Sequence, residues 1–130
     1  MLSDLEAVLR ADARIAYALV FGSTARGTAH PRSDVDVAVG LDPAASMGLA
    51  DLGALVSTLE EAAGQPVDLV LLDEAPPGLA YRIFRDGSVV TARDRAALTA
   101  RRARAILDYL DFRPIEDLCT KGVLAATHGR

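Results

Sequence analysis

The chain has 130 residues, of which 51% are hydrophobic and 25% charged, and a formal net charge of -4. This length suits one domain with a sizeable core, and this composition excludes a disordered chain. The acidic balance disfavours direct nucleic acid binding, because such proteins normally present a basic field to the phosphates.

Apolar periodicity predicts helices alternating with strands along the chain. In chain order the expected elements are a helix from Ser3 to Ala13, strands at 15–21 and 34–39, a helix at 43–63, a strand at 67–72, a helix at 76–86, a strand at 88–92 and a helix at 94–110. Ser3 and Glu6 form a capping-box pattern, and Gly64 and Gly87 mark two helix ends. The order predicts an α/β (α+β) fold, a small mixed sheet of about four strands flanked by helices.

The last predicted helix carries Ala100, Ala103, Leu107 and Leu110 as its apolar stripe, the side of a helix that normally faces a core. Pro114 is expected to break this helix. We therefore predict one domain at residues 1–113, with residues 114–130 as a C-terminal helical extension or a tail.

Membrane and export signals are not expected in this sequence. Charged residues interrupt any signal-peptide core in residues 1–13, and no run of 18 apolar residues is present. Cys119 is the single cysteine, which rules out an internal disulfide and favours a reducing compartment. These features predict a cytoplasmic protein that does not associate with membranes.

Two carboxylates interrupt the strand predicted at 34–39. Because strand side chains alternate between faces, Asp34 and Asp36 share one face of the sheet while Val35 and Val37 point into the core. Like charges this close raise each other's pKa unless a cation neutralises them. The pair therefore suits a hard divalent metal, with Mg²⁺ as the first candidate.

A third acid, Asp68, is the second residue of the strand predicted at 67–72. Three acids on neighbouring strands suit a two-metal site for phosphoryl or nucleotidyl transfer. In such a site Asp34 and Asp36 would bridge two Mg²⁺ ions. Asp68 would hold the ion beside the attacking hydroxyl and help take its proton. These three residues are the candidate metal ligands and catalytic residues.

The turn before the acids offers candidate nucleotide-binding groups. Gly22 lets the backbone approach a ligand, and Ser23 with the N–H groups after it can donate to phosphate oxygens. Arg26 can neutralise the same phosphates. With Ser33, these residues form the candidate set for ATP binding.

The pattern of Gly22-Ser23, ten intervening residues, Asp34-Val35-Asp36 and a later Asp68 resembles the signature of the polymerase-beta-type nucleotidyltransferase superfamily. Within it, the short chain and the segments GSTARGTAHPRSDVDVAV, VDLVLLDEAPPGLAYRIFRDGSVV and YLDFRPIEDL resemble the minimal nucleotidyltransferases, the MNT antitoxins of HEPN/MNT toxin-antitoxin pairs. The resemblance implies a minimal nucleotidyltransferase domain at 1–113. It also implies ATP- and Mg²⁺-dependent transfer of AMP to a tyrosine hydroxyl of a partner HEPN toxin, silencing its RNase activity.

Other interpretations stay open at this point. The three acids are alternatively strand-end charges paired with arginines, Ser23 a helix N-cap and Arg26 a solvated loop residue. A small-molecule nucleotidyltransferase, acting for example on an aminoglycoside, and an antitoxin that only binds its toxin are alternative functions. Assembly with identical or different chains is also undecided.

Two motif matches are excluded. A P-loop requires Lys where Thr28 stands, and an EF-hand requires its third ligand where Ala38 stands. A DxD glycosyltransferase would leave the Gly22-Ser23 turn unexplained and is larger than this chain.

Overall fold

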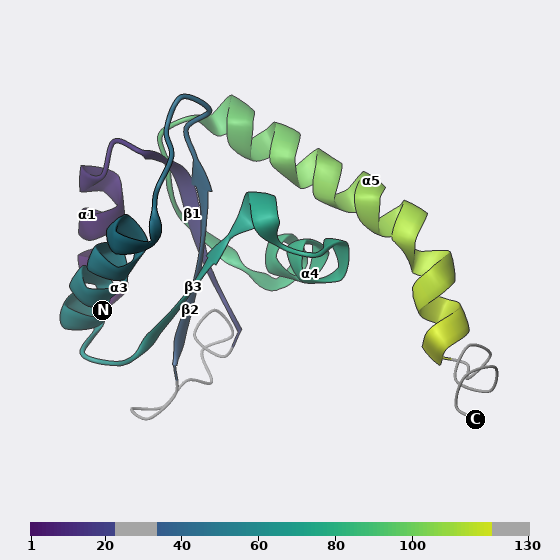
Figure 1. The fold of residues 1–130 in the computed structure, drawn as a ribbon, viewed down its shortest axis with the longest axis horizontal. Coiled ribbons are helices and arrows are strands. Elements are labelled where there is room, and N and C mark those ends of the chain that lie inside the picture. Colours follow the sequence, from purple (N-terminus) through teal and green to yellow (C-terminus); the bar gives the residue numbers. More distant parts are fainter. Residues whose placement is uncertain (23–33, 121–130) are drawn as a thin grey trace.

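The computed structural model describes residues 1–22 and 34–120 (Figure 1). Its elements are, in chain order, α1 (Leu2–Ala11), β1 (Ile15–Phe21), β2 (Val35–Leu41), α3 (Leu49–Ala63), β3 (Val67–Leu71), the 3-10 turn η1 (Leu72–Glu74), α4 (Pro77–Asp86), β4 (Ser88–Ala92) and α5 (Arg95–Thr120). The four strands predicted from the sequence are present, within two residues of their predicted bounds.

The strands form one mixed sheet in the order β3-β2-β1-β4. The central strand β1 pairs antiparallel with both β2 and β4, whereas β2 and β3 are parallel. The helix α3 makes the crossover that a parallel pair requires. The predicted α+β fold with a small mixed sheet is confirmed.

Helices cover both faces of the sheet, with α1 and α3 on one side and α4 and α5 on the other (Figure 1). Each layer has its own hydrophobic core. The core under α1 and α3 contains Leu5, Leu9, Ile15, Ala18, Val20, Val35, Val37, Val39, Leu55, Leu59 and Val67. The core under α4 and α5 contains Ala16, Tyr17, Leu19, Ala38, Leu72, Ala80, Ile83, Phe84, Leu98 and Ala105.

All four helices begin at residues other than those predicted, by one residue for α1, α4 and α5 and by six residues for α3. The helix α1 begins at Leu2 and has no side-chain cap, so the expected capping box at Ser3 and Glu6 is wrong. The helix α3 begins at Leu49 rather than at residue 43. Its start is delayed because Asp42 holds the following residues in a turn, accepting the N–H of Ala44 on Oδ1 at 2.9 Å.

The apolar stripe predicted for α5 faces solvent, which corrects the expectation that this side lies on the core. Leu98 and Ala105, on the opposite side of the helix, are buried. Leu107 is 62% exposed and Leu110 is 48% exposed. Both sides of this alanine-rich helix are apolar enough to pack, so periodicity alone did not distinguish them.

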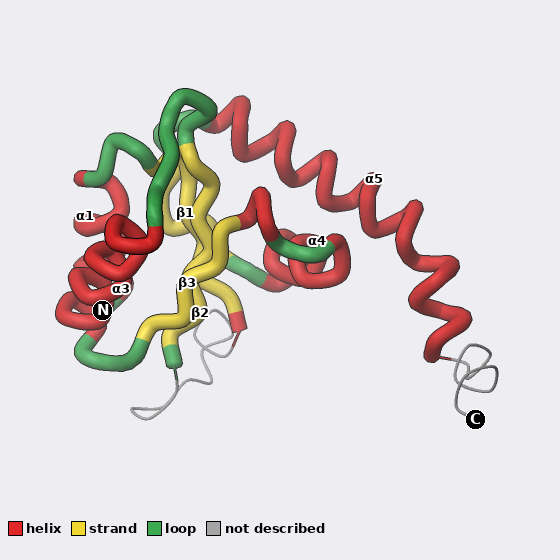
Figure 2. Tube along the Cα trace, in the orientation of Figure 1, coloured by secondary structure: helices red, strands yellow, loops and turns green. Residues whose placement is uncertain are grey.

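The helix α5 also continues through Pro114 to Thr120 (Figure 2), so the expected break at this residue is wrong. A proline removes one backbone donor from a helix, and here the neighbouring turns continue past it. The domain boundary predicted between residues 113 and 114 lies within α5 and stays a prediction. Residues 121–130 lie outside the described part of the chain. Within the described part, no helix is both long and apolar enough to cross a membrane.

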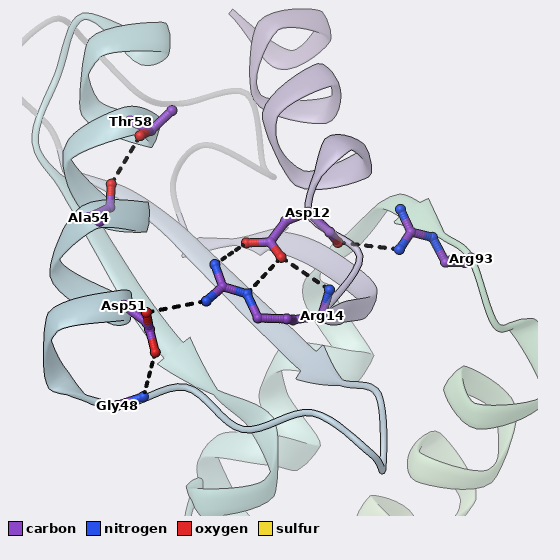
Figure 3. A network of polar contacts seen from close by, with 7 residues as sticks. All are labelled: Asp12, Arg14, Gly48, Asp51, Ala54, Thr58 and Arg93. Carbon is purple, nitrogen blue, oxygen red and sulfur yellow. Dashed lines mark hydrogen bonds and ion pairs between the residues drawn. The ribbon is translucent and has the colours of Figure 1, made fainter.

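A charged network joins the start of β1 to the start of α3 (Figure 3). The Arg14 guanidinium donates to both carboxylate oxygens of Asp12, at 2.9 and 2.8 Å. Its Nη1 lies 3.4 Å from Oδ1 of Asp51, whose Oδ2 accepts the N–H of Gly48 at 3.1 Å. The hydrogen bonds from Arg14 lower the pKa of Asp12 below 3.8, its usual value.

This network predicts a specific acid sensitivity. The pKa of Asp12 is lower in the folded chain than in the unfolded chain, so its ionised form stabilises the fold above the unfolded pKa. That contribution is lost as the pH falls through the folded pKa. We expect Asp12→Asn to flatten the pH dependence of the unfolding free energy below about pH 4, as measured by urea denaturation. An unchanged acid slope would contradict the role given to Asp12.

A close contact between β1 and β2 gives a second prediction. Gly40 lies opposite the buried Tyr17, and a Cβ at Gly40 would come within 2.0 Å of the Tyr17 ring. Gly40→Ala should therefore lower the free energy of unfolding by about 1–3 kcal/mol, the usual cost of overpacking a core. The matched control is Gly53→Ala in α3, where a Cβ meets nothing within 4 Å.

The control variant should be more stable than the wild type by up to about 1 kcal/mol, because alanine favours a helix interior over glycine. Both values are measured by chemical denaturation. Equal stability of Gly40→Ala and the wild-type protein would show that the Tyr17 ring moves aside at no cost.

Candidate functional site

The candidate site lies where β1 ends and where β2 and β3 begin. Phe21, the last residue of β1, is opposite Asp36 on β2, and Asp36 is in register with Asp68 on β3. The N–H of Val35 donates to the carbonyl oxygen of Pro66 at 2.9 Å, which joins the starts of the two parallel strands. Neighbouring strands run about 4.8 Å apart, so Asp36 and Asp68 are adjacent.

The acids project from the sheet face that α4 and α5 cover. On β2, Val35 and Val37 belong to the core under α1 and α3, so Asp36 between them points to the other face. On β3, Val67 belongs to the same core and Leu69 packs against it. Asp68 therefore points to the same face as Asp36.

Exposure differs among the three predicted acids. Asp34 and Asp68 are exposed, and Asp36 is half-buried. Asp34 precedes Val35, the first residue of β2, so sheet pairing does not hold it in place. Within residues 1–22 and 34–120, no group of three or more His, Cys, Asp or Glu side chains is arranged to hold a metal ion. The structure thus brings Asp36 and Asp68 together without gathering all three acids into one cluster.

Gly22 follows β1 and has a backbone φ of 70°, in the left-handed region that favours glycine. An added Cβ here would lie 2.3 Å from Oδ2 of Asp36. The sequence predicted that Gly22 leaves room for a ligand. The structure shows that its missing side chain also leaves room for the Asp36 carboxylate.

Phe21 is a site residue that the sequence did not single out. It packs, partly buried, against the core under α4 and α5 and lies opposite Asp36 in the sheet. In the sequence, Phe21 could have been recognised as a site residue from its place at the end of an apolar strand, directly before a glycine. Phe21 supplies an apolar boundary beside the carboxylates.

The remaining candidates Ser23, Arg26 and Ser33 lie outside the described residues. Their proposed contacts with phosphate therefore stay predictions. The described part of the site consists of Phe21, Gly22, Asp36 and Asp68 at one end of the sheet, with the exposed Asp34 directly before β2.

Comparisons with known proteins identify the family and the fold. The family model described as "Polymerase beta, Nucleotidyltransferase" matches residues 3–96, more than half of the chain. No curated protein sequence matches the chain.

Several solved structures are similar in fold. A chain from a toxin-antitoxin structure with AMP-PNP superimposes with a TM-score of 0.80 at 22% identity, covering 95% of this chain and 98% of that chain. A chain from a complex of tri-AMPylated Shewanella oneidensis HEPN toxin with MNT antitoxin gives a TM-score of 0.73 at 20% identity, with 95% and 99% coverage. A protein provisionally described as a minimal nucleotidyltransferase is 34% identical, with a TM-score of 0.56 and coverage of 66% and 88%.

The contact at Gly22 can be tested against a matched glycine. Gly22 and Gly64 both have a φ of 70°, but a Cβ at Gly64 would meet nothing within 4 Å. Each Gly→Ala variant should lose about 1–2 kcal/mol of unfolding free energy, the cost of a left-handed alanine. Only Gly22→Ala should also displace the Asp36 carboxylate, which the ¹³Cγ chemical shift of Asp36 reports. An Asp36 signal that responds equally in both variants would refute the contact.

Proposed function

The chain belongs to the polymerase beta nucleotidyltransferase family, and from this we propose that it is an antitoxin that transfers AMP from ATP to a tyrosine hydroxyl of a HEPN-domain toxin. Attachment of AMP would neutralise the RNase activity of the toxin. The lone Cys119 and the absence of a membrane-crossing helix from the described residues are consistent with the cytoplasm as the place of action.

One observation carries this proposal: Asp36 and Asp68 are in register, on one face of the sheet, beside the left-handed Gly22 that ends β1. Asp34 stands two residues before Asp36, directly before the first residue of that strand. Carboxylates in register on one face of a sheet, beside a glycine turn, form a donor set that a divalent cation and substrate phosphates can share, and this supports a nucleotide site.

The donor set fits Mg²⁺. This ion is usually held by one or two carboxylates together with substrate phosphates, so a cluster of three protein ligands is not required. Asp34 and Asp36 would hold the two ions proposed for the reaction, and Asp68 would hold one of them. When bound, Mg²⁺ would neutralise charge on the triphosphate.

The residues of the chain have separate roles in the proposed transfer. The acceptor tyrosine oxygen forms a bond to the α-phosphorus of ATP, the bond from that phosphorus to the bridging oxygen breaks, and pyrophosphate leaves. Asp68 would orient the acceptor hydroxyl and take up its proton. Gly22, Ser23, Arg26 and Ser33 would position the phosphates by backbone approach, hydrogen bonds and positive charge.

The proposed partner comes from proteins of similar fold. One is described in a toxin-antitoxin structure with AMP-PNP, an ATP analogue. Another is described as the MNT antitoxin in complex with a tri-AMPylated HEPN toxin. These descriptions support a HEPN toxin as acceptor and ATP as donor for the present chain.

The test is Asp36→Asn, which removes the charge and keeps the shape of the side chain. We expect AMP transfer to the purified HEPN toxin to fall by at least about a hundredfold, the usual effect of removing an electrostatic group that acts on the reacting atoms. Transfer is measured with α-labelled ATP and Mg²⁺, and the site of modification by intact-mass and peptide mass spectrometry.

Asp4→Asn is the matched control, because Asp4 is exposed in α1, which covers the opposite face of the sheet. It should leave transfer unchanged. Full transfer by Asp36→Asn would refute the site. Full toxin neutralisation in cells by the Asp34→Asn, Asp36→Asn double variant, without AMP on the toxin, would instead indicate an antitoxin that acts by binding alone.

A further inference from the structure

The outer side of α5 carries an apolar stripe at coiled-coil spacing. Its residues are Ala96, Ala100, Ala103, Leu107 and Leu110, separated by four, three, four and three positions. This spacing keeps apolar side chains on one line along a helix and is the pattern by which one helix packs against another. At 1.5 Å per residue the stripe is about 21 Å long, enough to contact about four turns of a partner helix.

The stripe is exposed, and α5 is held by its opposite side. All five residues of the stripe are exposed, with Leu107 at 62% and Leu110 at 48%. Leu98 and Ala105, on the inner side, are buried. The Tyr109 ring stacks on Tyr81 of α4 with centroids 4.1 Å apart. The helix is therefore fixed on the domain with its second apolar side turned outward.

This part of the chain is positively charged, although the whole chain is acidic. Residues 77–111, which span α4 to the middle of α5, contain seven arginines and four aspartates, a net charge of +3 against -4 for the chain. Arg95, Arg102 and Arg104 are exposed on α5. Arg104 forms an ion pair with Asp108 on the same helix, with Nε 3.5 Å from Oδ2. Exposed arginines therefore border the stripe, and an acidic partner surface would complement their charge.

The same charge argues against two other occupants. A second copy would place one +3 segment against another, with like charges close together in the interface. A nucleic acid would meet exposed leucines and alanines where its phosphates require cations. A helix with apolar residues on one side and acidic residues at its margins matches both properties of the stripe.

We propose that the outer side of α5, from Ala96 to Leu110, is the docking surface for an acidic amphipathic helix of the acceptor protein. This rests on the proposed function for the identity of the partner. Figure 1 shows α4 and α5 on one side of the sheet and α1 and α3 on the other. The alternation of β2 and β3 places Asp36 and Asp68 on the side of α4 and α5. A protein docked along α5 therefore lies on the same side of the sheet as these two carboxylates.

The test measures binding separately from transfer. The probe is a cognate HEPN-domain toxin in an RNase-inactive form, titrated by calorimetry with the full chain in the absence of ATP. The Leu107→Asp, Leu110→Asp double variant should bind at least about tenfold more weakly, because it places charge in an apolar contact. The matched control, Leu49→Asp, alters an 88% exposed leucine of α3 on the other side of the sheet and should bind within about twofold of wild type.

Charge is tested in the same titration. Arg104→Glu should weaken binding and reduce its dependence on salt, whereas Arg10→Glu in α1, another exposed arginine, should do neither. Circular dichroism of each variant checks that the fold is intact.

The outcomes separate this proposal from the proposed function. Wild-type affinity in the Leu107→Asp, Leu110→Asp variant would overturn the docking surface whatever happens to AMP transfer. Intact binding by a wild-type chain that transfers no AMP would overturn the enzymatic function alone. A wild-type dimer in sedimentation that the double variant abolishes would assign the stripe to a second copy and overturn the proposal.

Discussion

The alternation of side chains along β2 is the constraint on which the rest of the structure depends. Its valines enter the core under α1 and α3, and this places Asp36 on the opposite face. A slip of one residue in register would bury the aspartates and expose the valines, at the cost of moving unpaired charges into an apolar core. Pairing with β1 on one side and β3 on the other holds β2 against such a slip. The position of the carboxylates is therefore secured by apolar burial on the far side of the sheet.

Close packing around two glycines extends this constraint to neighbouring strands. At Gly40 the Tyr17 ring occupies the space of a side chain, which ties β1 to β2 in the core under α4 and α5. At Gly22 the Asp36 carboxylate occupies that space. The first contact supports the sheet, and the second shapes the site at its end. Both belong to the same pair of strands, so fold stability and site geometry are coupled through the β1–β2 pairing.

The helix α5 has two apolar sides, and this connects the domain to its proposed partner. The inner side completes the core with Leu98 and Ala105, while the outer side presents Leu107 and Leu110 to solvent. A helix that served the core alone would carry polar residues on its outer side. If the proposed function and docking surface hold, the exposed arginines of α5 would attract an acidic acceptor to the side of the sheet that carries Asp36 and Asp68.

By itself the sequence determined the four strands, the ends of α3 and α4 and the face of the sheet on which Asp36 lies, because period-two alternation and helix-ending glycines act over a few residues. Tertiary structure alone decided the strand order, the register of Asp36 with Asp68 and the contact of Gly22 with Asp36. It also decided which side of α5 is buried and where α3 begins. The roles of Ser23, Arg26 and Ser33 stay predictions of the sequence. The choice between two apolar sides of one helix, or between two partners of one strand, depends on segments far apart in the chain, and local patterns do not contain that information.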